Sequence, residues 1–299
     1  MYPELIFFIG KGGVGKSTVS ATTAFHFSGQ SQKTLLVSMD PAHNQRDIFE
    51  DVFSEIPRPV NAFLSVKEVD TDFWIQKYLK ETQKMVKATY SYESAFNLDS
   101  YFNVLQFSPG LEEYALLLAF DATIASSAGV SRIIFDMAPT ALSLRFLALP
   151  SVTLIWLEEL MKLRNKIIAK KEIITKIKIG KKQIETDKIR SRLDGLIKRY
   201  QRLSRMFQAV DTRINLVMND DRMSFSEARR IKNKLQEIGM HIHTVVVNKA
   251  MNNRIPLNIS ETFKEQRIAL FPMEKNGLMG CSAIKNYLTA NPGPFRNFD

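Results

Sequence analysis

The chain has 299 residues, of which 45% are hydrophobic and 24% are charged, proportions that are ordinary for a folded globular protein. Intrinsic disorder and collagen-like structure are therefore excluded, and a chain of this length can bury a substantial core. Because Cys281 is the only cysteine, the sequence also excludes an internal disulfide, a zinc site made of paired cysteines and an arsenite site made of several thiols within one chain.

The positive charge is concentrated in one part of the chain. The formal net charge is +10, from 41 basic and 31 acidic residues. Residues 161–200 contain 14 basic and four acidic residues, so the rest of the chain is neutral overall. The basicity therefore belongs to one module and not to the whole protein.

Short apolar runs alternate with helical patterns along the sequence. The runs predicted to be buried strands are 5–9, 34–39, 63–69, 132–136, 214–218, 244–247 and 267–271. The helical patterns include 16–28, 71–126 with a break at 108–110, and 224–238. This alternation predicts an α/β fold in which a mostly parallel twisted sheet is flanked by helices. In the third run, Lys67 and Glu68 indicate that one edge of the strand faces solvent.

Residues 153–212 are predicted to form a basic helical insert. Apolar residues recur there at helical spacing, with Lys and Arg on the other faces: Ile189, Leu193, Leu196, Ile197, Tyr200, Leu203 and Phe207. The α/β domain is then formed by 1–152 and 213–299, and 71–126 is expected to contribute helices to the helical subdomain. Two interpretations of the insert stay open, because its lysines either are only solvated or form a functional basic surface.

No apolar run approaches the roughly 20 residues of a membrane-spanning helix. The early run from Leu5 to Ile9 is too short for a signal peptide and lacks a basic start. We therefore expect a cytoplasmic protein.

The strongest chemical signal is a glycine-rich loop after the first predicted strand. Residues Gly10-Lys11-Gly12-Gly13-Val14-Gly15-Lys16-Ser17 satisfy the pattern G-x-x-x-x-G-K-[ST] and open a predicted helix that continues with Thr18. Backbone N–H groups of such a loop approach phosphates, and the helix N-terminus adds positive potential. Lys16 is expected to reach the β- and γ-phosphates of a nucleotide, and the Ser17 hydroxyl to ligate Mg²⁺.

The loop has a second lysine, Lys11, and here the sequence resembles the deviant-Walker P-loop ATPases, whose signature is K-G-G-x-G-K-[ST]. The string D-P-A-H-N at 40–44 resembles the first switch of one branch, the arsenite-pump and tail-anchored-protein-targeting ATPases. Residues 136–150, which begin D-M-A-P-T, are similar to the second switch of that branch. This chain departs from the pattern at Ala141-Leu142, where the branch usually has Gly-His.

The resemblance implies that the nucleotide is ATP, that ATP is hydrolysed and that the catalytic residues are Asp40, Lys11 and Lys16. Lys11 would reach across a homodimer to the partner's nucleotide. Asp40 would position or activate the attacking water, although an Asx turn before Pro41 would also explain this residue. Asp136 would hold the Mg²⁺ shell through water.

Two strings near the C-terminus resemble the adenine-contacting strand ends of the same branch. They are V-V-V-N at 245–248 and F-P at 271–272. An asparagine side chain both donates to and accepts from an adenine edge. We therefore expect Asn248 and Pro272 to lie near the base.

The biological role has three alternatives. The preferred one, because of the switch strings, is a dimeric switch that couples nucleotide state to the binding of a protein client. The second is a positioning or partitioning factor whose basic residues at 162–199 bind anionic membrane or nucleic acid. The third is a maturation factor that remodels another enzyme, which the lack of an exposed cysteine ligand set disfavours.

Overall fold

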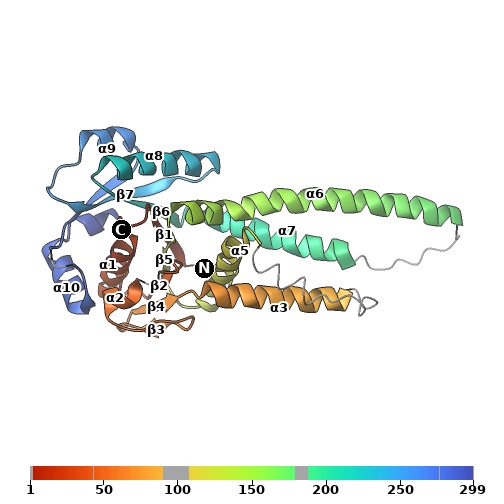
Figure 1. Ribbon diagram of the computed structural model, residues 1–299, viewed down its shortest axis with the longest axis horizontal. Coiled ribbons are helices and arrows are strands. Elements are labelled where there is room, and N and C mark those ends of the chain that lie inside the picture. Colours follow the sequence, from red (N-terminus) through yellow and green to blue (C-terminus); the bar gives the residue numbers. More distant parts are fainter. Residues whose placement is uncertain (1–2, 43, 90–107, 179–187, 276, 299) are drawn as a thin grey trace. The chain divides into compact units, whose positions relative to one another are not determined.

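The computed structural model describes residues 3–42, 44–89, 108–178, 188–275 and 277–298. The chain divides into two compact units (Figure 1). The first unit is made of residues 1–146 and 210–299, and the second is made of residues 147–209. The predicted insert began at residue 153, which is later than the boundary in the structure, because one helix runs through this region without a break.

The first unit is formed around an eight-stranded sheet in the order β3-β4-β2-β5-β1-β6-β7-β8. All pairings are parallel except that of β3 with β4. The predicted mostly parallel α/β fold is therefore confirmed. The strands are β1 (Glu4–Gly10), β2 (Thr34–Ser38), β3 (Arg58–Pro59), β4 (Leu64–Glu68), β5 (Arg132–Asp136), β6 (Thr212–Asn219), β7 (Ile242–Ala250) and β8 (Arg267–Pro272).

Helices of the first unit cover both faces of the sheet (Figure 1). They are α1 (Lys16–Gly29), α2 (Gln45–Phe49), α3 (Thr71–Thr89), α5 (Leu111–Ser126), α8 (Arg222–Glu237), α9 (Leu257–Thr262), α10 (Gly280–Ala290) and the 3₁₀ turn η1 (Pro294–Asn297). On one face, α1, α2, α10 and η1 share a buried cluster with Ile6 and Phe8 of β1. Helix α8 begins after Asp221, whose carboxylate accepts a hydrogen bond from the Ser224 N–H at 2.8 Å.

On the opposite face, α5 packs against the centre of the sheet. The ring of Phe120 lies 6.1 Å from that of Phe7 in β1 and 5.1 Å from that of Phe135 in β5. Both α3 and α5 belong to the first unit. The expected contribution of 71–126 to the helical subdomain is thus corrected for the described helices, because the apolar side of α5 forms part of the sheet's core. Residues 90–107 of that stretch lie outside the described residues.

The second unit contains most of α6 (Thr140–Lys178) and all of α7 (Lys188–Phe207). Helix α6 continues through Pro150. The hydroxyl oxygens of Ser151 and Ser204 lie 3.2 Å apart and link the two helices. Of the apolar residues predicted along α7, Tyr200, Leu203 and Phe207 are buried. The stripe therefore serves packing over the last two turns of α7.

Residues 140–170 of α6 are long and apolar enough, by length and composition, to cross a membrane, and 28% of the apolar window is buried. The expectation that the chain has no such segment rested on uninterrupted apolar runs, whereas this helix meets the criterion although charged residues such as Arg145 interrupt it. The core helix of a globular protein meets the same criterion.

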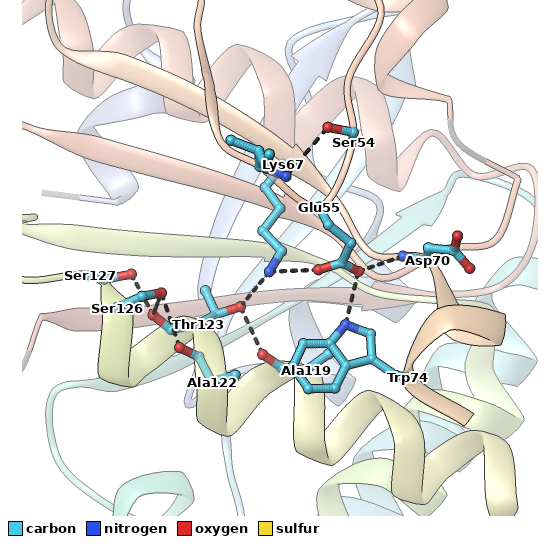
Figure 2. Close-up of polar contacts among 11 residues, drawn as sticks. Ser54, Glu55, Lys67, Asp70, Trp74, Ala119, Ala122, Thr123, Ser126 and Ser127 are labelled. Atoms are coloured by element: carbon cyan, nitrogen blue, oxygen red, sulfur yellow. Dashed lines mark hydrogen bonds and ion pairs between the residues drawn. The ribbon is translucent and has the colours of Figure 1, made fainter. Parts of the chain in front are cut away.

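The prediction that Lys67 and Glu68 mark a solvent-exposed edge is wrong, since both residues are buried. Figure 2 shows why Lys67 is stable there. Its Nζ lies 2.9 Å from Glu55 Oε2 and donates to Thr123 Oγ1 at 3.2 Å. The other oxygen of Glu55 accepts from the indole N–H of Trp74 at 2.8 Å. A buried lysine is tolerated because its charge is paired and hydrogen-bonded.

A cavity of about 240 Å³ lies beside this ion pair. Its lining includes Thr34 and Phe63 at the amino ends of β2 and β4, together with Lys67 and Ser127. Thr34 and Phe63 lie at the edge of the sheet opposite the glycine-rich loop, whereas Lys67 lies near the carboxyl end of β4, and no residue of that loop lines the cavity. The cavity is therefore separate from the site described next.

Candidate active site

The glycine-rich loop connects the carboxyl end of β1 to the first residues of α1. Gly10 has φ +154° and lies so close to the carbonyl oxygen of Val217 that a Cβ would collide with it. Gly15 has φ +92°, and a Cβ there would collide with the side-chain amide of Asn248. Glycine is needed at both positions because the backbone is left-handed and closely packed. The loop is thus fixed by β6 and β7, far away in sequence.

Lys16 is only 4% exposed although it carries a charge. Its Nζ donates to the carbonyl of Lys11 at 3.5 Å, within the loop itself. Burial lowers the pKa of Lys16, and the carboxylates of Asp136 and Asp40 partly oppose this shift. The ammonium group therefore lies inside the loop with two carboxylates nearby. Gly12 and Gly13 are exposed, Val14 is buried, and Lys11 and Thr18 are partly exposed.

Asp136 ends β5 at the centre of the sheet, where it pairs with Phe8 of β1 and with Ser38 of β2. Its side chain is fully buried. Burial raises the pKa of Asp136 from 3.8 to about 6, while hydrogen bonds from Ser17 and Gln45 and the charge of Lys16 act in the opposite direction. The structure therefore brings Asp136 together with Lys16 and Ser17, as the sequence predicts.

Asp40 follows the neighbouring strand β2 and is 7% exposed. Its Oδ1 accepts from the Ala42 N–H at 3.1 Å, which is the geometry of an Asx turn. The backbone holds this segment against β5, since the Met39 N–H donates to the Asp136 carbonyl at 2.8 Å. Asp40 therefore forms the Asx turn and still lies beside the glycine-rich loop. His43 lies outside the described residues.

Two side chains after Asp40 reach α1: Asn44, which ends the 40–44 string but was given no role of its own, and Gln45, which the sequence pattern did not single out. Asn44 Nδ2 donates to Ser17 Oγ at 3.4 Å. Gln45 is fully buried, and its Nε2 donates to Asp136 Oδ2 at 2.9 Å and to the Ser17 carbonyl at 3.4 Å. The only sequence signal for Gln45 was its position as a polar residue directly after the 40–44 string.

The two residues predicted to contact adenine lie at the ends of neighbouring strands. Asn248 is near the end of β7 and its Nδ2 donates to the Val14 carbonyl at 2.8 Å. Pro272 ends β8, pairs with Ala250, and accepts at its carbonyl from the Tyr287 hydroxyl at 3.0 Å. Asn248 thus contacts the glycine-rich loop directly, whereas Pro272 lies one strand further out in the sheet.

The second switch string becomes the first turns of α6, which begins four residues after Asp136. The Ser143 hydroxyl donates to the Ala138 carbonyl, which fixes the turn between β5 and α6. Arg145 forms an ion pair with the buried Glu113 of α5, with 2.6 Å between Nε and Oε1. The start of α6 is therefore anchored to the turn after β5 by a hydrogen bond and to α5 by a salt bridge.

Comparison with known proteins decides the family. A family profile described as "Anion-transporting ATPase" matches residues 3–289 of this chain. The chain belongs to the anion-transporting ATPase family. It is 28% identical over 268 residues to "Putative arsenical pump-driving ATPase 2" of Aquifex aeolicus, covering 88% of this chain and 84% of that protein. It is 30% identical to "ATPase GET3C" of Arabidopsis thaliana over 260 residues, covering 81% and 66% of the two chains.

A third relative is "Putative arsenical pump-driving ATPase" of Chlorobaculum tepidum, 30% identical over 255 residues, or 83% of this chain and 62% of that protein. The chain thus spans less than two thirds of the length of the second and third relatives. The family resemblance predicted from the loop and the two switch strings is confirmed, and the enzymatic activity of this ATPase family is ATP hydrolysis.

The residues of this anion-transporting ATPase family member fit a hydrated Mg²⁺. Ser17 and Asp136 supply the oxygen ligands that this hard cation prefers. Asp136 Oδ1 is buried and accepts no hydrogen bond from the described residues, so it is available to a water of the ion's shell. No group of three His, Cys, Asp or Glu side chains in the described residues is arranged to hold a metal, so the candidate Mg²⁺ site relies on the Ser17 hydroxyl, one carboxylate and water.

Proposed function

We propose that this chain is a MgATP-driven homodimeric switch that couples its nucleotide state to the binding of a hydrophobic protein client in the cytoplasm. Support comes from the family membership, from the site formed by the loop and the two switch strings, and from one feature of α6. That helix begins beside Asp136 and carries an exposed apolar stripe further along the chain.

In the proposed reaction the N–H groups of loop 10–17 and the start of α1, including Thr18, bind the phosphates of ATP. Lys16 neutralises charge on the β- and γ-phosphates. The metal would be held by the Ser17 hydroxyl and, through water, by Asp136, and it would neutralise charge on the transferred phosphoryl group. Asp40 orients the attacking water from its place beside β5, and Asn248 and Pro272 lie toward the base.

The stripe on α6 carries the client part of the proposal. Its members lie three or four residues apart, except for the adjacent Ile155 and Trp156, and are between 44% and 68% exposed: Val152, Ile155, Trp156, Leu160, Leu163 and Ile167. They extend over about 23 Å at 1.5 Å per residue. A surface of this length and spacing matches one face of an apolar helix of a client, which packs by inserting side chains at the same spacing.

The continuity of α6 supplies the coupling. No residue between Thr140 and Lys178 leaves the helical conformation, so the helix that starts four residues after Asp136 is the one that carries the stripe. A shift of the 136–140 segment on loss of the γ-phosphate would therefore be transmitted along a continuous helix. Closed switch states of this kind are selected by the contacts that only the triphosphate makes.

Trp156 provides a direct test, because it is 68% exposed and the only other tryptophan is the buried Trp74. In Trp74→Phe protein, we expect a synthetic apolar helical peptide to shift the Trp156 emission to shorter wavelength with the non-hydrolysable analogue AMP-PNP and Mg²⁺, and less with ADP. Adding Ile155→Ser and Leu163→Ser should abolish the shift. Adding Met223→Ser, at an exposed methionine outside the stripe, should not.

The second candidate function is binding to an anionic membrane, and one observation favours it. Residues 147–209 contain 16 basic and six acidic residues, a net charge of +10 that equals that of the whole chain. Vesicles with and without phosphatidylserine separate the two candidates in the same assay. A peptide response with no vesicle response supports the client; a vesicle response that needs phosphatidylserine and disappears at high salt supports the membrane.

The assignment of the catalytic loop has its own test. Lys16→Ala should lower ATP hydrolysis by about 100-fold or more, because it removes the cation that faces the transferring phosphoryl group. Lys264→Ala, at an exposed lysine, is the matched control. Full hydrolysis by the Lys16→Ala protein would refute the site.

A further inference from the structure

Gln45 is a buried side chain that connects the three parts of the site. It is the first residue of α2, directly after the first switch string, and none of its surface is exposed. Its Nε2 lies 2.9 Å from Asp136 Oδ2 at the end of β5 and 3.4 Å from the Ser17 carbonyl in α1. We propose that Gln45 is a positioning residue that holds Asp136 in the orientation required to bind hydrated Mg²⁺. This inference rests on the proposed magnesium site at Ser17 and Asp136.

The hydrogen bonds fix the orientation of the Gln45 amide. Both of its partners, a carboxylate and a backbone carbonyl, are acceptors, so the NH₂ end has to face them. The Oε1 atom of Gln45 is consequently directed elsewhere, and it is buried without a donor among the described residues. Asp136 Oδ1 is in the same state. Two buried acceptors in one site, each without a donor, match a ligand that brings donors, as the water shell of a cation does.

The bond from Gln45 also decides which oxygen of Asp136 stays available. Because Oδ2 accepts from Gln45, the carboxylate cannot rotate freely, and Oδ1 is the atom left without a donor. A leucine or methionine of similar size fills the same space but donates nothing. The carboxylate would then lose its fixed orientation. Partners that orient a metal-binding side chain typically contribute 10- to 100-fold to metal affinity.

The experiment separates the metal from the nucleotide. Calorimetric titrations measure AMP-PNP binding to the full chain in excess EDTA, and then Mg²⁺ binding to the protein saturated with AMP-PNP. For Gln45→Leu we expect Mg²⁺ to bind about 10-fold or more weakly, while AMP-PNP binding in EDTA stays within about twofold. Gln45→Met, whose side chain has nearly the length of glutamine, repeats the test if the leucine protein does not fold.

Each result decides the matter. Unchanged Mg²⁺ affinity in a folded Gln45→Leu or Gln45→Met protein overturns the proposal. An equal loss of AMP-PNP affinity in EDTA and of Mg²⁺ affinity also overturns it, because a residue with a merely structural role would weaken both kinds of binding. Ser17→Ala and Asp136→Asn test the underlying site: if they leave Mg²⁺ affinity unchanged, the metal assignment fails, whereas a loss in these variants alone refutes only the role of Gln45.

Discussion

The side-chain amide of Asn248 donates a hydrogen bond to the carbonyl of Val14 at 2.8 Å, across 234 positions of sequence. It thereby holds the middle of the glycine-rich loop against the end of β7. The same amide lies where a Cβ on Gly15 would be, so the loop and the strand end fit together without spare room. An asparagine expected to contact the base thus fixes the loop that is proposed to bind the phosphates.

Asn248→Ala should therefore weaken both the fold and phosphate binding. Losing the donor leaves the buried Val14 carbonyl unpaired, which costs about 1–3 kcal/mol of unfolding free energy. Urea denaturation without nucleotide measures this loss, and calorimetry measures the accompanying drop in affinity for ATP. Asn253→Ala, at an exposed asparagine, should change neither quantity. A purely base-contacting Asn248 would lower affinity and leave the stability without nucleotide intact.

The buried carboxyl of Asp136 predicts an unusual pH dependence for the protein without ligands. Its pKa rises from 3.8 to about 6 on folding, chiefly through burial. Between these values the folded protein holds a proton that the unfolded chain has released. The contribution of the Asp136 carboxyl to the stability of the folded protein is thus fully present below pH 3.8, and it is lost as pH rises through about 6. At pH 7 the free energy of unfolding is therefore lower by about 3 kcal/mol than it is below pH 3.8, as far as this group is concerned.

Asp136→Asn should remove this dependence, because the amide stays neutral and still pairs with the Gln45 side chain. Urea denaturation of both proteins in EDTA between pH 5 and pH 8 makes the comparison. We expect the Asn variant to be more stable than the natural protein at pH 7, with a difference that shrinks toward pH 5. Parallel pH profiles for the two proteins would contradict the raised pKa of Asp136.

The parts of the site that could be predicted are those whose chemistry is contained in a contiguous string. Lys16 and Ser17 were recognisable because the loop pattern itself specifies their geometry. Gln45 was not, since its proposed role depends on contacts that form only where α2, β5 and α1 meet. The stripe on α6 was not predicted, because an apolar helical pattern does not show whether that face of the helix is packed or exposed.

Lys67 shows a different limit of sequence reasoning. Alternation rules assign a charged residue to solvent, but Glu55 supplies its counter-charge from outside the strand, 12 residues earlier. Such a partner cannot be identified from strand periodicity. The α/β class was recoverable because seven apolar runs carried it independently, and an error at one lysine did not alter the alternation.

The Lys67–Glu55 pair should be important for stability. Glu55→Ala leaves a buried ammonium without its counter-charge, and because the Glu55 side chain is 23% exposed, we expect a loss of about 2–3 kcal/mol. The double variant Glu55→Ala with Lys67→Met should recover part of this loss, since no unpaired charge remains. Urea denaturation of the single and double variants forms a double-mutant cycle. Strict additivity would show that the pair contributes no coupling energy.

Lys11 provides the test of the proposed homodimer. Within one chain its carbonyl, not its ammonium, contacts Lys16, and its side chain is only partly buried. Lys11→Ala therefore keeps the internal contact and removes only the group proposed to reach the partner's nucleotide. In an Asp40→Asn background, which is proposed to slow hydrolysis, we expect MgATP to produce a dimer in sedimentation velocity and Lys11→Ala to abolish it. Affinity for ATP should change little, because the loop N–H groups and Lys16 remain.

Lys275→Ala, at an exposed lysine outside the loop, should dimerise normally. If the Asp40→Asn protein stays monomeric with MgATP, the homodimer is refuted. If it dimerises equally well with Lys11→Ala, the dimer stands and Lys11 does not hold it together.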